Sequence, residues 1–274
     1  MKANETQPTL TYRTIISQLF ITLGSLRAAI ELIRERELWQ GINRYSWVFK
    51  ALVIVAIIVG LSFLTEVGSW VGRLFVGDTD INAFAAMGTM ISNVVTEGYE
   101  SFTSGLLKYV ILVLSEVVVF HFMQRALEEI QGHPIRTDFQ AFFTAQVRMI
   151  KVAIRAWIME VIVSALVSVF FGIFGFLDWL ESPILFLTQC YFFGLVILDN
   201  YNEQFGMTIK ESMAFSKSYI GVSLALGFVL YLLMLIPLIG VLCGTILVSV
   251  TGAIVMSKIA KLEITSPTAE ISAD

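Results

Sequence analysis

The sequence predicts an all-helical integral membrane protein, and three observations support this class. Of its 274 residues, 57% are hydrophobic and 15% are charged, and the mean hydropathy is +0.79, whereas soluble domains carry about 25% charged residues. Apolar runs recur along the chain, and about 20 helical residues are enough to cross a hydrocarbon slab. Between Ile220 and Val255 there is no charged side chain, and Pro237 and Gly240 interrupt this run near its middle.

Composition also argues against several functions. The net charge of −4 is atypical of a nucleic-acid-binding protein. Cys190 and Cys243 lie in apolar runs and form no C-x-x-C motif. The sequence also has too few histidines to complete a zinc site with them. No phosphate-binding glycine loop, H-E-x-x-H or G-x-S-x-G motif occurs. We therefore expect no enzymatic activity, no metal and no cofactor. We expect no cleavable signal either, because the first apolar run begins near Trp47.

The first predicted element is an amphipathic helix over Leu10 to Leu38, within a cytoplasmic segment of residues 1–46. Its apolar residues recur at helical spacing, and the other face carries basic residues, namely Arg13, Arg27, Arg34 and Arg36. A helix of this kind lies in the membrane interface.

Residues 47–125 are predicted to hold two spanning helices with an extracytoplasmic segment between them. The spans cover about Trp47 to Leu64 and Leu106 to Gln124. Residues 126–151 then form a charged cytoplasmic helical segment. Pro134 predicts a helix boundary in it, because proline disfavours helix in the residue before it.

Two apolar helical hairpins follow, over residues 152–198 and 219–257. The first turns at Asp178 to Pro183, and the second turns at Pro237 and Gly240, since proline and glycine end helices. A bare turn cannot face lipid, so each turn must reach the far interface or lie within protein.

A cytoplasmic linker over residues 199–218 joins the hairpins, and residues 264–274 form a short acidic tail. Thr208 and Glu211 have the spacing of a capping box, and the rest of the linker is interpreted as helix caps and a solvated helix face. Lysine and arginine concentrate before the first span, after the second, and around the last hairpin. The positive-inside rule therefore puts both termini in the cytoplasm.

Short motifs resemble one known family. The chain contains Asp199-Asn200-Tyr201, then Ile209-Lys210-Glu211, then an apolar hairpin around the run Ile236 to Gly240. The helix from Phe122 to Gly132 and the turn Gly41 to Arg44 also have counterparts. In order and spacing these pieces resemble the CysZ-type sulfate permeases, which share a broader family with the etoposide-induced membrane proteins. The sequence departs from the family at three points. Asn43 replaces an arginine, Gly240 replaces an asparagine, and Asp199-Asn200-Tyr201 is a scrambled form of the family's Asp-Tyr-Pro.

The resemblance implies a bacterial inner-membrane protein in which only the runs near Val55 and Leu112 span fully. The two later hairpins would then enter the bilayer and turn back. It also implies assembly into a homo-oligomer and sulfate or a related oxyanion as ligand. Membrane lipids are the other expected partner.

The candidate anion site comprises Gly41, Ile42, Asn43 and Arg44. Successive backbone N–H groups next to a glycine can point at one anion, and the arginine fork suits sulfate. In the resembling family this motif binds sulfate at the entrance to the first span. The alternative is a turn between helices whose Arg44 anchors to lipid headgroups.

Three ionisable residues fall inside predicted membrane helices, namely Glu116, His121 and Glu160. Such residues are costly at membrane depth and mark functional sites. Glu116 and Glu160 could line an aqueous path or share a proton, although two carboxylates would repel sulfate. The alternative is a structural polar contact between helices, with His121 near the cytoplasmic interface.

The function predicted from sequence is passage of a sulfate-like oxyanion through an inner-membrane permease or channel. One rival is a non-catalytic scaffold or accessory subunit of a larger membrane assembly, which the missing arginine and the charge-free hairpins favour. A second rival is a lipid-handling membrane protein.

Overall fold

A computed structural model describes residues 11–40, 107–132, 139–234, 236 and 240–262. Within these ranges the regular structure is entirely helical. Five helical stretches are long and apolar enough to cross a membrane, namely Tyr12–Glu35, Thr144–Ile173, Glu181–Gln204, Ile209–Met234 and Gly240–Ile259. The predicted all-helical membrane class is confirmed at this level.

The N-terminal helix predicted over Leu10 to Leu38 consists of two helices, α1 (Tyr12–Gly24) and α2 (Leu26–Glu35). They meet at Ser25, whose hydroxyl donates to the Ile21 carbonyl over 2.8 Å, a bond that bends helices. The pair buries Thr22 and Ala29 and exposes Ile16 and other apolar residues. The pair is also long and apolar enough to cross a membrane. Its sequence therefore suits a membrane crossing as well as the predicted position in the membrane interface.

Helix α5 (Leu107–Gln131) contains nearly all of the predicted second span and continues for seven residues past Gln124. It ends at Gly132, whose φ of +76° is the left-handed conformation that commonly terminates a helix. The break predicted before Pro134 therefore falls at its expected place. The first predicted span lies outside the described residues.

The first hairpin is made of α6 (Phe139–Ile173), the 3-10 helix η2 (Gly175–Leu180) and α7 (Glu181–Gln204). Pro183 occupies the first turn of α7, where its missing N–H costs nothing. Helix α7 is longer than predicted, because it continues through residues 199–204. The start of the predicted linker is therefore helix, and it is buried.

A corner at Gly206, with φ +71°, leads from α7 into α8 (Ile209–Ser216), the 3-10 helix η3 (Lys217–Tyr219) and α9 (Ile220–Met234). The last helix is α10 (Gly240–Ile259). The long charge-free run is thus two helices. Pro237 lies outside the described residues, and Gly240 is the first residue of α10.

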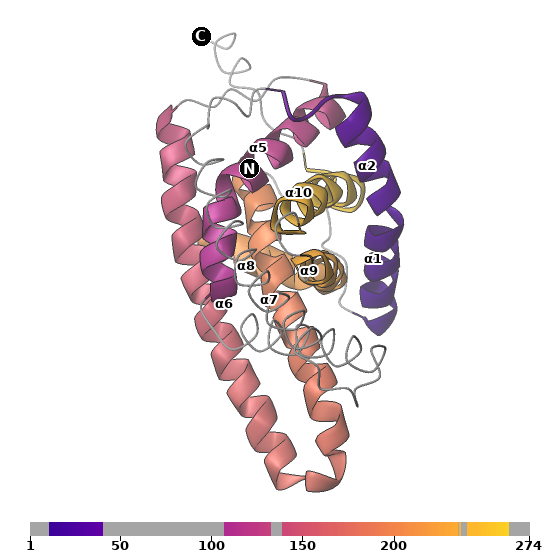
Figure 1. The fold of residues 1–274 in the computed structure, drawn as a ribbon, viewed down its shortest axis with the longest axis vertical. Helices are drawn as coiled ribbons and strands as arrows, with labels where there is room; N and C mark the ends of the chain where they lie inside the picture. The colour runs from indigo at the N-terminus through magenta and orange to yellow at the C-terminus, as the bar shows by residue number, and fades with distance from the viewer. Residues whose placement is uncertain (1–10, 41–106, 133–138, 235, 237–239, 263–274) are drawn as a thin grey trace, which may run out of the picture.

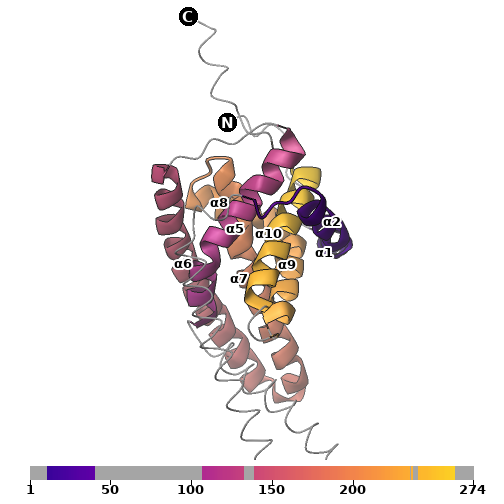
Figure 2. The ribbon, with the colours of Figure 1, turned by 45° about the horizontal axis from the view of Figure 1, so that its top comes forward.

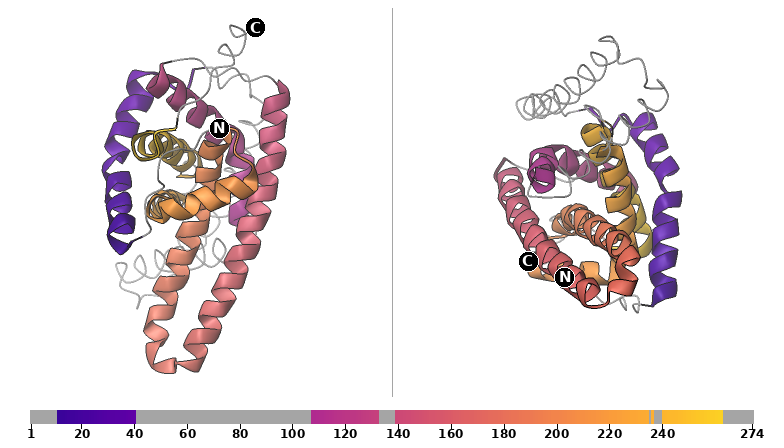
Figure 3. Two further views of the ribbon diagram at one scale, coloured as in Figure 1. Left: turned by 180° about the vertical axis from the view of Figure 1, so that it is seen from behind. Right: turned by 60° about the horizontal axis from the view of Figure 1, so that its bottom comes forward.

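The helices are arranged in layers (Figure 1). Helix α6 lies at one edge, α5 and α7 beside it, α9 and α10 next, and α1 and α2 at the opposite edge. Figure 2 shows α9 and α10 side by side against α7. The α6–α7 hairpin projects beyond the rest of the bundle, and the segment from α8 into α9 runs across it (Figure 3).

Helices α7 and α9 touch at their backbones. A Cβ atom added to Gly194 would lie 1.8 Å from the Ser223 carbonyl oxygen, and one added to Gly227 would lie 1.7 Å from that of Cys190. Glycine is needed at both positions because no side chain fits between the helices. Small residues bring helices together in this way in membranes, and here they hold the two hairpins in contact.

Candidate functional site

Polar residues gather at the C-terminal end of α7, in the run Asp199-Asn200-Tyr201-Asn202-Glu203. Asp199, Asn200 and Asn202 are each at most 3% exposed. Consecutive residues of a helix point in different directions, whereas residues four apart share a face. The run therefore reaches three neighbouring helices, with Asp199 and Glu203 toward α6, Asn200 toward α5, and Asn202 toward α8.

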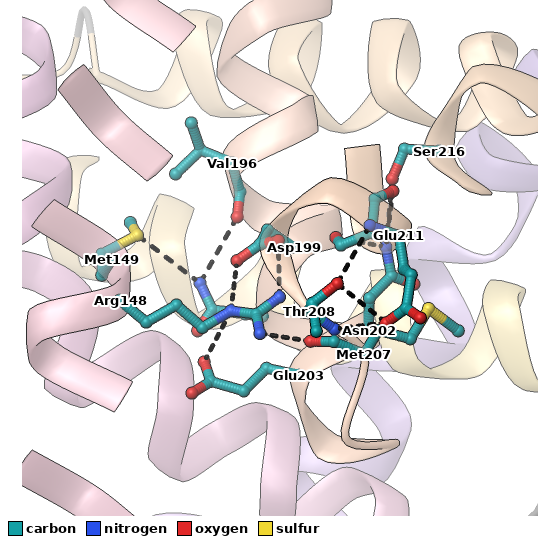
Figure 4. Close-up of polar contacts among 12 residues, drawn as sticks. Arg148, Met149, Val196, Asp199, Asn202, Glu203, Met207, Thr208, Glu211 and Ser216 are labelled. Carbon is teal, nitrogen blue, oxygen red and sulfur yellow. Dashed lines mark hydrogen bonds and ion pairs between the residues drawn. The ribbon is translucent and has the colours of Figure 1, made fainter. Parts of the chain in front are cut away.

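Arg148 of α6 is the cation of this cluster (Figure 4). Its Nε and Nη2 donate to the two carboxylate oxygens of Asp199, each over 2.9 Å. Its Nη1 donates to the Met207 carbonyl in the corner between α7 and α8. Glu203 lies 3.7 Å from Arg148 Nε. This two-pronged pairing is the strong form of an arginine–carboxylate contact, and it fixes α6, α7 and the corner to one another.

Glu116 of α5 meets Asn200 of α7. The Asn200 side-chain Nδ2 donates to Glu116 Oε2 over 3.0 Å. It also lies 3.4 Å from the Val196 carbonyl and 3.9 Å from the Met149 sulfur. Glu116 has no exposed surface. Among the described residues neither Glu116 Oε1 nor Asn200 Oδ1 has a hydrogen-bond partner, and such orphaned buried atoms call for an explanation.

Asn202 fastens α8 to α7. Its Nδ2 donates to the hydroxyl oxygens of Ser212 and Ser216 over 2.9 and 3.0 Å. Thr208 caps α8, since its hydroxyl accepts from the Glu211 N–H and the Glu211 carboxylate accepts from the Thr208 N–H. The predicted capping box is confirmed. The interpretation of Asp199, Asn200 and Asn202 as a solvated face is wrong, because all three are buried.

The structure separates the three ionisable residues singled out in the membrane helices. Glu116 belongs to the polar cluster. His121 Nε2 donates to the Leu38 carbonyl over 3.1 Å, which joins α5 to the end of the N-terminal helix pair. Glu160 is buried in α6, but eleven residues beyond Met149 it lies about 16 Å further along the helix axis. The structure pairs Glu116 with Asn200, and a shared aqueous path of Glu116 and Glu160 stays a prediction.

The candidate anion site at Gly41, Ile42, Asn43 and Arg44 lies outside the described residues. Its assignment stays a prediction.

Sequence reasoning missed Arg148 and Asn200 as members of a site. Arg148 falls within the predicted charged cytoplasmic segment of residues 126–151, and Asn200 falls within the predicted linker of residues 199–218. One signal is present in the sequence: from Leu195 to Gln204 there is no proline or glycine, so nothing in the sequence ends the helix at residue 199. Five consecutive polar residues on a continuing helix point around its whole circumference, so in a packed bundle some of them face neighbouring helices.

No family model, curated protein or solved structure matches the chain. Its fold and its site define the class: a multi-pass helical membrane protein with a buried polar cluster between α5, α6 and α7.

Proposed function

We propose that the chain is a membrane permease for a small solute, with a sulfate-like oxyanion as the substrate class. One observation carries the proposal: an ionisable residue, Glu116, is fully buried among helices of a membrane protein and contacts a second helix through Asn200. Charged groups at membrane depth are costly and mark solute and proton pathways. A chain that served only as a membrane anchor would gain nothing from a buried ionisable residue that offsets this cost.

The described cluster does not suit the oxyanion itself. Arg148 is already matched by Asp199 at 2.9 Å and has Glu203 at 3.7 Å, and Glu116 adds a further carboxyl group. An oxyanion there would meet more negative than positive charge. We therefore assign oxyanion binding to Gly41–Arg44, where a glycine and an arginine are three positions apart in sequence.

Sulfate flux tests this function. Liposomes carrying the purified protein should take up sulfate faster than empty liposomes. Replacing Arg44 with alanine should weaken sulfate binding roughly ten- to hundredfold, since a charge-assisted hydrogen bond contributes about 1.5–3 kcal/mol. Asn43→Arg should strengthen binding.

Arg34→Ala is the matched control, because Arg34 is exposed on α2 and lies outside the proposed site. Equal, weak sulfate binding by the unmodified protein, Arg44→Ala and Asn43→Arg would refute the oxyanion assignment.

A scaffold subunit is the second candidate, and one observation favours it. Arg148 donates to Asp199 and to the Met207 carbonyl, so the cation of the described cluster is engaged in holding helices together. A non-transporting subunit also needs an ion pair that holds its helices together. Purification under mild conditions separates the two functions: stoichiometric partner proteins favour the scaffold, whereas a homo-oligomer active in flux favours the permease.

A further inference from the structure

The Glu116–Asn200 pair has a feature that packing leaves unexplained. Both side chains are buried, at 0% and 2% exposure, yet each keeps one oxygen without a donor among the described residues, Oε1 of Glu116 and Oδ1 of Asn200. Leaving a buried acceptor unpaired costs about 1–3 kcal/mol. Two such acceptors in one contact indicate that a donor joins the pair in some state of the protein.

Charge around the pair points in the same direction. Among the residues that the structure describes, the charged groups that act on Glu116 are Arg148 from α6 and Asp199 and Glu203 from α7. Arg148 is committed to Asp199 through two hydrogen bonds of 2.9 Å. With every group ionised, three carboxylates would face one guanidinium, and uncompensated charge away from water is strongly unfavourable. A small cation reduces this excess.

We propose that Glu116 is a reversible proton-binding site whose two protonation states are both accommodated by the Asn200 amide. In the ionised state Glu116 accepts from Nδ2, through the 3.0 Å contact present in the structure. In the protonated state the carboxylic O–H becomes a donor. It donates to Asn200 Oδ1 once the amide group has rotated by about 180° about its Cβ–Cγ bond. The proton comes from water, no other bond is made or broken, and one of the orphaned oxygens gains its donor.

Rotation of the Asn200 amide breaks only weak contacts besides its bond to Glu116. Besides Glu116, Nδ2 has only a long contact of 3.4 Å to the Val196 carbonyl and a 3.9 Å contact to the Met149 sulfur. Both are at the weak end of hydrogen-bond geometry. The proton site does not depend on the proposed oxyanion site and would exist whether or not the protein carries sulfate.

Infrared difference spectroscopy tests the site on the full-length protein in lipid. Stepping the pH from alkaline to acid should produce a carboxylic-acid C=O band that shifts in D₂O. The band should be lost in Glu116→Gln and kept in Glu160→Gln and Glu203→Gln. In Asn200→Leu it should move to higher frequency, because the acid loses its hydrogen-bond partner.

A band that disappears in Glu203→Gln and survives in Glu116→Gln would overturn the proposal. So would a band that fades when sodium replaces choline at constant pH, since the site would then hold a sodium ion. Protein made with ¹³C-labelled glutamate gives the same test without a substitution. An acid band that fails to shift with that label belongs to an aspartic acid and would also overturn it.

Sulfate flux is a separate readout. A protein that shows the Glu116 band but no flux keeps the proton site and loses the proposed function.

Discussion

The two hairpins are built from similarly apolar sequence, yet they meet different surroundings. In the apolar stretch of α6, 17% of the residues are buried, whereas in that of α10 the share is 67%. The exposed side of α6 is made of large branched and aromatic residues, including Ile162, Leu166 and Val169. Helices α9 and α10 instead contain many glycine, serine and threonine residues. In this protein, residue size thus separates the surfaces that face other helices from the exposed ones where hydropathy does not.

The largest effect is expected inside the first hairpin, where Arg148 joins α6 to α7. Arg148→Leu leaves Asp199 buried without its cation, and breaking such a pair costs about 3–5 kcal/mol. The free energy of unfolding in detergent measures this loss. Lys151→Leu is the control, since Lys151 is exposed on the same helix. The double variant Arg148→Leu/Asp199→Leu should recover most of the stability, and a double variant as unstable as the single one would contradict the pairing argument.

The next largest effect is expected from a buried leucine of the second hairpin, compared with an exposed leucine of the first. Leu230 of α9 has no exposed surface, whereas Leu166 of α6 is 65% exposed. Leu230→Ala should destabilise the protein by about 2–5 kcal/mol through the cavity it leaves, and Leu166→Ala should have little effect. Thermal unfolding of both variants in the same detergent compares them. A large loss at Leu166 would mean that α6 packs against another chain.

The contact between the hairpins gives a smaller effect. Gly227→Ala places a methyl group against the Cys190 carbonyl, and overpacking of this kind costs about 1–3 kcal/mol. Gly172→Ala is the control, because a Cβ at Gly172 meets nothing within 4 Å. Unfolding temperatures should fall for the first and hold or rise for the second. An unchanged Gly227→Ala would show that α7 and α9 do not touch at their backbones.

The smallest effect is expected in the link between the hairpins. Thr208→Ala removes the cap of α8, and loss of an N-cap costs about 0.5–2 kcal/mol. Thr208→Ser keeps the hydroxyl and should retain most of the stability. Amide hydrogen exchange across Ile209–Ser216 should accelerate in the alanine variant alone. Equal exchange in both variants would argue against the capping box.

Much of the fold could be predicted because its signals are local. Proline and glycine mark helix ends, as in the break between α9 and α10, and the Thr208–Glu211 spacing marks a cap. The polar cluster could not be predicted in the same way. Arg148 and Asp199 are 51 residues apart, and Glu116 and Asn200 are 84 apart. Only packing of α5, α6 and α7 brings them together, and a single sequence has no periodic pattern that encodes such a meeting.

The close approach of α7 and α9 restricts how the protein can move. Where two helices touch through glycines, sliding one along the other by a single residue would drive a side chain into a backbone carbonyl. Sliding of α7 along α9 by one or a few residues is therefore sterically blocked. The two helices can therefore shift only together, as one rigid pair, and the bonds from Arg148 to Asp199 tie that pair to α6.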